Sequence, residues 1–166
     1  MDVKVRVADG EAVKELVREA KSYAAAKLGV PDARQLLAGN HREAWSYFCY
    51  RIAGLIGEFV GTADDMVRAV YLVDESAWDE GAAPALGVTL ILHVARRTAS
   101  TEMAIGWLND QLPSVLADEV GVRPAVPFVT AYLVEDAEVA SRTGVAAAIR
   151  GTHAPALLVW ERSTAG

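Results

Sequence analysis

Residues 66–94, MVRAVYLVDESAWDEGAAPALGVTLILHV, decide the fold of this chain. The two ends of the stretch, 67–73 and 88–94, are dense in Val, Leu, Ile and Tyr. Runs of this kind, bounded by turn-forming residues, predict β-strands. An acidic connection rich in Ala, Gly and Pro separates them, so we expect two neighbouring strands of one sheet.

A helix, a strand, a second helix and a final strand are predicted after this stretch. The apolar positions of residues 101–120 recur every three or four residues, which predicts a helix. Pro113 lies inside that pattern, and a proline removes a helical hydrogen bond, so we expect a kink or break near residues 111–112. The remaining elements are predicted at 128–134 (strand), 137–150 (helix) and 156–160 (strand).

The segment before residue 63 is predicted to be mainly helical. Helices are expected at 11–28, 31–37 and 41–60, after a short edge strand at 3–7. Gly54 and Gly57 weaken the third helix by about 1 kcal/mol each relative to Ala, so we expect another element to approach closely there. The element order predicts a single domain, 1–166, of the α/β (α+β) class. It has a helical N-terminal segment, 1–62, and a β-β-α-β-α-β core with a mixed sheet, 63–162.

Composition limits the classes of function. Apolar residues make up 52% of the 166 residues and charged residues 23%, an ordinary globular balance. The net charge of −6 disfavours nucleic acids and anionic membranes as partners. The lone Cys49 excludes an intramolecular disulfide, and no His, Cys or acidic residues follow a metal-site spacing, so no metal is predicted. The start of the chain lacks the apolar run of a signal peptide, and no run is long enough to span a bilayer, which predicts a cytoplasmic protein.

The region 67–162 resembles the small, single-domain nucleotidyltransferases of the polymerase-β superfamily. That family begins its core with a strand ending in Gly-Ser, continues with an apolar strand carrying D-x-D, and often adds a third carboxylate on a later strand. The matching segments are VRAVYLV (67–73), GVTLIL (87–92), DEVGV (118–122) with FVT (128–130), and GTHAPALLVWE (151–161). The resemblance implies a mixed-sheet core with a cleft on the Thr89 side of the sheet.

The chain departs from the family at the positions that carry the chemistry. Asp74 and Glu75 stand where the family has Gly-Ser, and Gly87 and Thr89 stand where it has the two aspartates. Thr130 is the polar residue nearest to the third carboxylate. Paired carboxylates hold the two Mg²⁺ ions of this reaction, so the resemblance implies that nucleotide transfer is lost and that no residue is catalytic. We expect a domain without a cofactor that acts by ligand binding or protein association, with a nucleotide as one candidate ligand.

Two alternatives stay open. One is an enzyme with a rebuilt phosphate-handling site and Mg²⁺, and the other is an unrelated α/β interaction domain. The candidate ligand-binding residues are Asp74, Glu75, Thr89, His93, Arg96 and Thr130. In the rebuilt site, Arg96 would clamp an anion. The acidic residues also fit a solvated loop, and His93 also fits a hydrogen-bonded histidine under the N-terminal helices, which is the interpretation we favour.

Aromatic residues supply the candidates for an interface. Trp45 and Tyr50 lie on the 41–60 helix, where Trp45 also fits the core, and Trp78 lies in the acidic loop. Trp78 either anchors a partner or folds back onto the sheet. We expect the N-terminal helices to pack beside or across the sheet and to narrow the cleft on its Thr89 side. Those helices would then present Trp45 or Tyr50 to a second copy in a homodimer, or to another protein partner.

Overall fold

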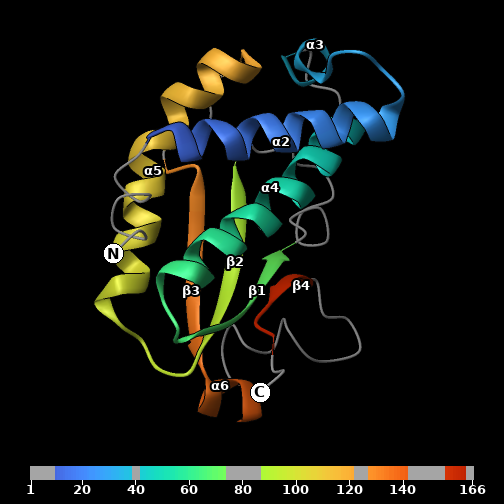
Figure 1. The fold of residues 1–166 in the computed structure, drawn as a ribbon. Helices are drawn as coiled ribbons and strands as arrows, with labels where there is room; N and C mark the ends of the chain where they lie inside the picture. Colours follow the sequence, from blue (N-terminus) through green and yellow to red (C-terminus); the bar gives the residue numbers. More distant parts are fainter. Residues whose placement is uncertain (1–9, 39–41, 74–86, 122–126, 142–155, 164–166) are drawn as a thin grey trace.

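A computed structural model describes residues 10–38, 42–73, 87–121, 127–141 and 156–163. The elements in chain order are α2 (Gly10–Leu28), α3 (Ala33–Ala38), α4 (Arg42–Ala63), β1 (Val67–Val73), β2 (Val88–Val94), α5 (Ala99–Val120), β3 (Val129–Glu135), α6 (Asp136–Ser141) and β4 (Ala156–Glu161) (Figure 1). The described strands and helices confirm the α+β class and the β-β-α-β-α-β order. The expected strand at 3–7 and most of the expected 137–150 helix lie outside the described residues.

The four strands form one mixed sheet in the order β3-β2-β1-β4. β1 pairs antiparallel with both β2 and β4, and β2 pairs parallel with β3. Leu72 is the register partner of Leu90, so the prediction that the first two strands are neighbours is confirmed. The parallel pair needs a crossover connection, which α5 provides.

The main core lies between the sheet and the helices α2, α4 and α5. Every second residue of β2 faces this core because side chains alternate along a strand. The buried β2 residues on this face are Val88, Leu90, Leu92 and Val94. α4 crosses this face of the sheet, and α2 packs outside it on both α4 and α5 (Figure 1). α4 packs mainly on β1 and β4, and burial of the apolar surfaces between them holds the helical segment to the sheet.

The N-terminal helices do pack across the sheet, as expected, but the expectation that they narrow a cleft on the Thr89 side is wrong. α4 lies on the same face as α5, so the N-terminal helices do not narrow a cleft beside Thr89. The physical reason is that the other face of β2 is apolar without interruption, whereas the Thr89 face also carries His93. On that second face, Val139 of α6 packs in a small separate cluster with Ile91 and Val134.

Glycines bring α4 close to the sheet, as expected from the sequence. A Cβ at Gly57 would lie 2.8 Å from Trp160 Cβ and 3.2 Å from Val70 Cβ, and a Cβ at Gly54 would lie 3.2 Å from Val159 O. A Cβ at Gly61 would overlap the indole ring of Trp160. The expectation of a close approach at Gly54 and Gly57 is therefore confirmed, and the approaching elements are β4 and β1.

Pro113 lies inside α5 and changes the direction of the helix. α5 runs through Pro113 without a break, and its two halves differ in direction (Figure 1).

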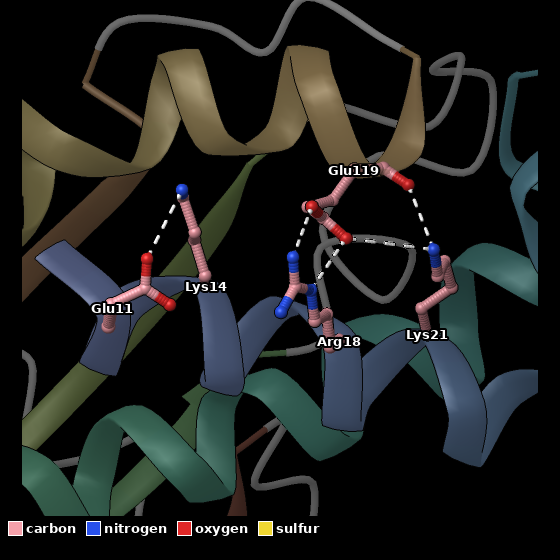
Figure 2. Close-up of polar contacts among 5 residues, drawn as sticks. All are labelled: Glu11, Lys14, Arg18, Lys21 and Glu119. Carbon is pink, nitrogen blue, oxygen red and sulfur yellow. Dashed lines mark hydrogen bonds and ion pairs between the residues drawn. The ribbon is translucent and has the colours of Figure 1, made fainter.

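Polar contacts join the C-terminal end of α5 to α2. Glu119 accepts two hydrogen bonds from Arg18 of α2, at 3.0 and 3.2 Å, and Lys21 donates to the Glu119 carbonyl at 3.1 Å (Figure 2). The hydrogen bond from Arg18 lowers the pKa of Glu119 despite some desolvation. These contacts fix how α2 lies on α5.

Candidate functional site

Two of the candidate ligand-binding residues lie side by side on the two parallel strands. Thr89 of β2 and Thr130 of β3 are register partners and belong to the same face of the sheet. Gly87 precedes β2, and a Cβ at this position would lie only 2.8 Å from Phe128 O. An aspartate at position 87 therefore does not fit this backbone. Among the described residues, no group of three or more His, Cys, Asp or Glu side chains is arranged to hold a metal ion.

His93 takes part in a polar cluster at the carboxyl ends of β2 and β3. Its Nε2 atom lies 2.7 Å from Oδ1 of Asp136, the first residue of α6. The guanidinium of Arg68 donates two hydrogen bonds to the same carboxylate, at 2.8 and 2.9 Å. A bulge between Val67 and Ala69 makes Arg68 an extra residue in β1 relative to β2. His93 is thus hydrogen-bonded as favoured, but its partner comes from α6 and not from the N-terminal helices.

Arg68 in this cluster and Arg97 beside it are each paired with at least one carboxylate. Hydrogen bonding from Arg68, with a smaller contribution from His93, lowers the pKa of Asp136 even though desolvation opposes this. Next to it, Arg97 forms ion pairs with Glu135 at 3.4 Å and with Glu138 at 3.0 Å. The neighbouring carboxylates offset the positive potential of these arginines, so the arginines would attract a phosphate group only weakly. The cluster therefore ties α6 to the sheet and is a poor anion site.

A second polar cluster surrounds the buried Asp64, just after α4. Its carboxylate accepts hydrogen bonds from Thr98 Oγ1 at 2.6 Å, from Met66 N–H at 2.9 Å and from the Thr101 hydroxyl. Burial alone would raise the pKa of Asp64, but these hydrogen bonds and the nearby charge of Arg162 bring it below its ordinary value. Since Thr98 also caps α5, this carboxylate joins the end of α4 to the starts of β1 and α5.

Arg162 completes that junction from the end of the chain. Its guanidinium donates to the carbonyls of Val67 at 2.9 Å, Asp64 at 3.0 Å and Gly61. The guanidinium also lies over the ring of Trp160, 5.4 Å from its centroid. These contacts lock β4 to the end of α4 and the start of β1. Asp64 and Arg162 were not singled out from the sequence, because neither belongs to a recognisable motif.

Of the other candidate ligand-binding residues, the structure describes only Arg96. Arg96 is exposed and forms no ion pair with another described residue. Asp74, Glu75 and Trp78 lie outside the described residues, so their predicted roles stay predictions. Asp136 is the residue that sequence reasoning missed, although its place directly after a strand parallel to β2 was a usable signal.

The aromatic interface candidates on α4 behave differently from each other. Trp45 is only 2% exposed and packs edge-on against Phe48 at 5.3 Å, so its assignment to an interface is wrong and its core role is confirmed. Tyr50 is 41% exposed. The ring of Tyr23 in α2 lies 6.2 Å from the ring of Tyr50 and 6.4 Å from that of Tyr47. Tyr50 therefore remains a candidate for contact with a partner.

None of the described helices is long and apolar enough to cross a membrane. No protein-family model matches the chain, and neither the curated proteins nor the solved structures contain a match to it.

Proposed function

We propose that this protein is a non-catalytic, nucleotidyltransferase-like domain that acts by associating with a protein partner or by binding a ligand. The observation that carries the proposal is the pairing of Thr89 with Thr130 on adjacent strands. In the family that the chain resembles, neighbouring strands hold the metal-binding carboxylates at these positions. Here both positions carry neutral hydroxyl groups.

The chemistry of the transfer reaction supports the loss of activity. Two Mg²⁺ ions neutralise the triphosphate and activate the attacking hydroxyl, and paired carboxylates hold those ions. A threonine hydroxyl carries no charge and is a much weaker ligand for a hard cation. At Gly87, contact with Phe128 O leaves no room even for the first carbon of an aspartate side chain.

A transfer assay tests this proposal directly. The full chain is incubated with labelled ATP, CTP or UTP, Mg²⁺ and candidate hydroxyl acceptors, and product is measured. We expect no transfer above the background without protein. Transfer that Thr89→Ala abolishes, while the exposed-surface variant Met103→Ala retains it, would contradict the proposal.

A rebuilt active site is the second candidate, and the short contact between His93 and Asp136 favours it. A carboxylate that orients an imidazole is a common arrangement in general acid–base catalysis. Calorimetry with Mg²⁺, Mn²⁺ and each nucleotide is the discriminating experiment. Binding that is lost in both His93→Gln and Asp136→Asn would favour this candidate, whereas no heat with any of these probes would reject it.

A further inference from the structure

The backbone of β3 alternates between groups that face β2 and groups that face away from it. Val88 N–H donates to Phe128 O at 2.9 Å, so the N–H and C=O of the next residue, Val129, point away from β2. The same alternation places the other outward groups at every second residue up to Glu135. β3 is the last strand in the order of the described sheet, so these groups line its outer edge. An edge of this kind is a template on which another strand can pair.

Asn109 of α5 binds the first of these outward groups at two points. Its side-chain oxygen accepts from Val129 N–H at 2.8 Å, and its amide nitrogen donates to Val129 O at 2.9 Å. A side-chain carboxamide offers the same kinds of donor and acceptor as a peptide group. An antiparallel neighbour would exchange this same pair of hydrogen bonds with Val129. The Asn109 side chain therefore occupies the place that the backbone of a further strand would take.

Two more side chains bind outward groups near the other end of β3. Arg97, from the β2–α5 connection, donates to Leu133 O at 2.7 Å. The carboxylate of Glu138 in α6 accepts from Glu135 N–H at 3.0 Å. Arg97 also forms ion pairs with Glu135 and Glu138, at 3.4 and 3.0 Å, so these contacts support one another. Both ends of the edge thus have partners from other elements of the same chain.

We propose that the Asn109, Arg97 and Glu138 side chains close the β3 edge against strand pairing, and that Asn109 contributes most. A strand that added to β3 would have to break the two-point contact at Val129 before it could form its own hydrogen bonds there. Since Asn109 is part-buried, its displaced amide would lose partners that water replaces only incompletely. The inference goes beyond the proposed function, because it names an edge that a partner does not use and holds for a catalytic or a non-catalytic domain.

Asn109→Ala tests the proposal, because it frees both groups of Val129 and leaves the net charge of −6, and hence the repulsion between copies, unchanged. In the wild-type chain, hydrogen exchange of the amides of residues 129–135 should not depend on protein concentration. In the variant, β3 of one copy should pair with β3 of another. Sedimentation should then show self-association at least on the order of ten-fold tighter than in the wild type, because two freed groups gain partners. The same amides should exchange more slowly as the concentration of the variant rises.

Two controls separate an opened edge from a loss of stability. Ile105→Val on the buried side of α5 also destabilises the chain but leaves the contacts to β3 in place. At a temperature where the same fraction of each variant is unfolded, it should associate like the wild type. Adding Tyr132→Lys to Asn109→Ala should reverse the association, since Tyr132 is 46% exposed on β3 and a lysine on an edge strand opposes pairing. The lysine makes the chain less negative, so a general repulsion between copies cannot account for this reversal.

Arg97→Ala keeps the proposal testable if Asn109→Ala does not fold, because Arg97 is exposed and its removal frees one outward carbonyl of β3. It should give the same concentration-dependent protection of residues 129–135, to a smaller degree. Slower exchange of these amides in the wild-type chain at high concentration would overturn the proposal. So would an Asn109→Ala chain that associates no more than the wild type, no more than the Ile105→Val control, or just as strongly after Tyr132→Lys is added. Nucleotide transfer by a chain that meets every expectation here would refute the proposed function and leave the closed edge standing.

Discussion

Substituting Gly57 by alanine tests whether the contact between α4 and the sheet determines the packing of this protein. Gly57 lies inside α4, where alanine is favoured over glycine by about 1 kcal/mol. The added methyl carbon would lie 2.8 Å from Trp160 Cβ and 3.2 Å from Val70 Cβ. Both neighbouring atoms are Cβ atoms, which are bonded directly to the backbone. They can move away only if the backbone of β4 or β1 moves with them. Gly57→Ala therefore sets helix propensity against tertiary packing.

The expected magnitude follows from these distances. Carbon atoms pack best at about 3.5–4.0 Å, so α4 would have to move about 0.7 Å away from β4 and loosen its contact with β1 as well. Overpacking of this kind costs about 1–3 kcal/mol. After subtraction of the propensity gain of about 1 kcal/mol, we expect Gly57→Ala to lower the free energy of unfolding by up to about 2 kcal/mol.

Gly106→Ala is the matched control, because Gly106 also lies inside a helix, α5, but apart from its own helical turn no described residue comes within 4 Å of the added carbon. It should raise the free energy of unfolding by about 0.4–1 kcal/mol. Both variants gain the same propensity, so the difference between them, about 1–3 kcal/mol, isolates the overpacking cost. Denaturant titration measures it, and thermal unfolding should separate the two midpoints by about 2–4 °C per kcal/mol. Equal stabilisation by both variants would refute the reasoning.

Three further predictions concern the buried carboxylate, the β3 edge and the N-terminal helices. The pKa of Asp64 is lower in the folded chain than its ordinary value of about 4, so its contribution to stability is present above that pH and is lost as the pH falls through the folded-state pKa. Asp64→Asn should therefore lower stability at neutral pH and flatten the acid limb of a stability–pH curve, whereas the exposed Asp65→Asn should not. Asn109→Ala leaves the N–H and C=O of Val129 without their partner and should cost about 1–3 kcal/mol in denaturant titration, against less than about 0.5 kcal/mol for the exposed Asp110→Ala. Deleting residues 1–60 removes most of α4 from the core and should leave an aggregating or molten product by light scattering and near-UV circular dichroism; a soluble, cooperatively folded monomer would contradict this.

Local patterns in the sequence were sufficient for most of the secondary structure. The first two strands were predicted with the bounds that the structure has, because runs rich in Val, Ile and Leu between turn residues are unambiguous. The glycines of α4 were correctly read as a close approach, since glycine inside a helix needs a packing reason. The candidate site was predicted only in part. Thr89 and Thr130 do lie together, but the hydrogen bonds that Asp136 makes to His93 and Arg68 carried no motif.

The sequence by itself determined which residues form strands and helices, because these depend on periodicity and turn chemistry within short windows. Only the tertiary structure decided that α4 shares one face of the sheet with α5, because the pattern of β2 shows which face is more apolar but not how many helices fit on it. Tertiary structure likewise decided that the Asn109 side chain binds the N–H and C=O of Val129 at the β3 edge of the sheet. These contacts join residues far apart in the chain, and no local pattern records which partners the folded chain will bring together.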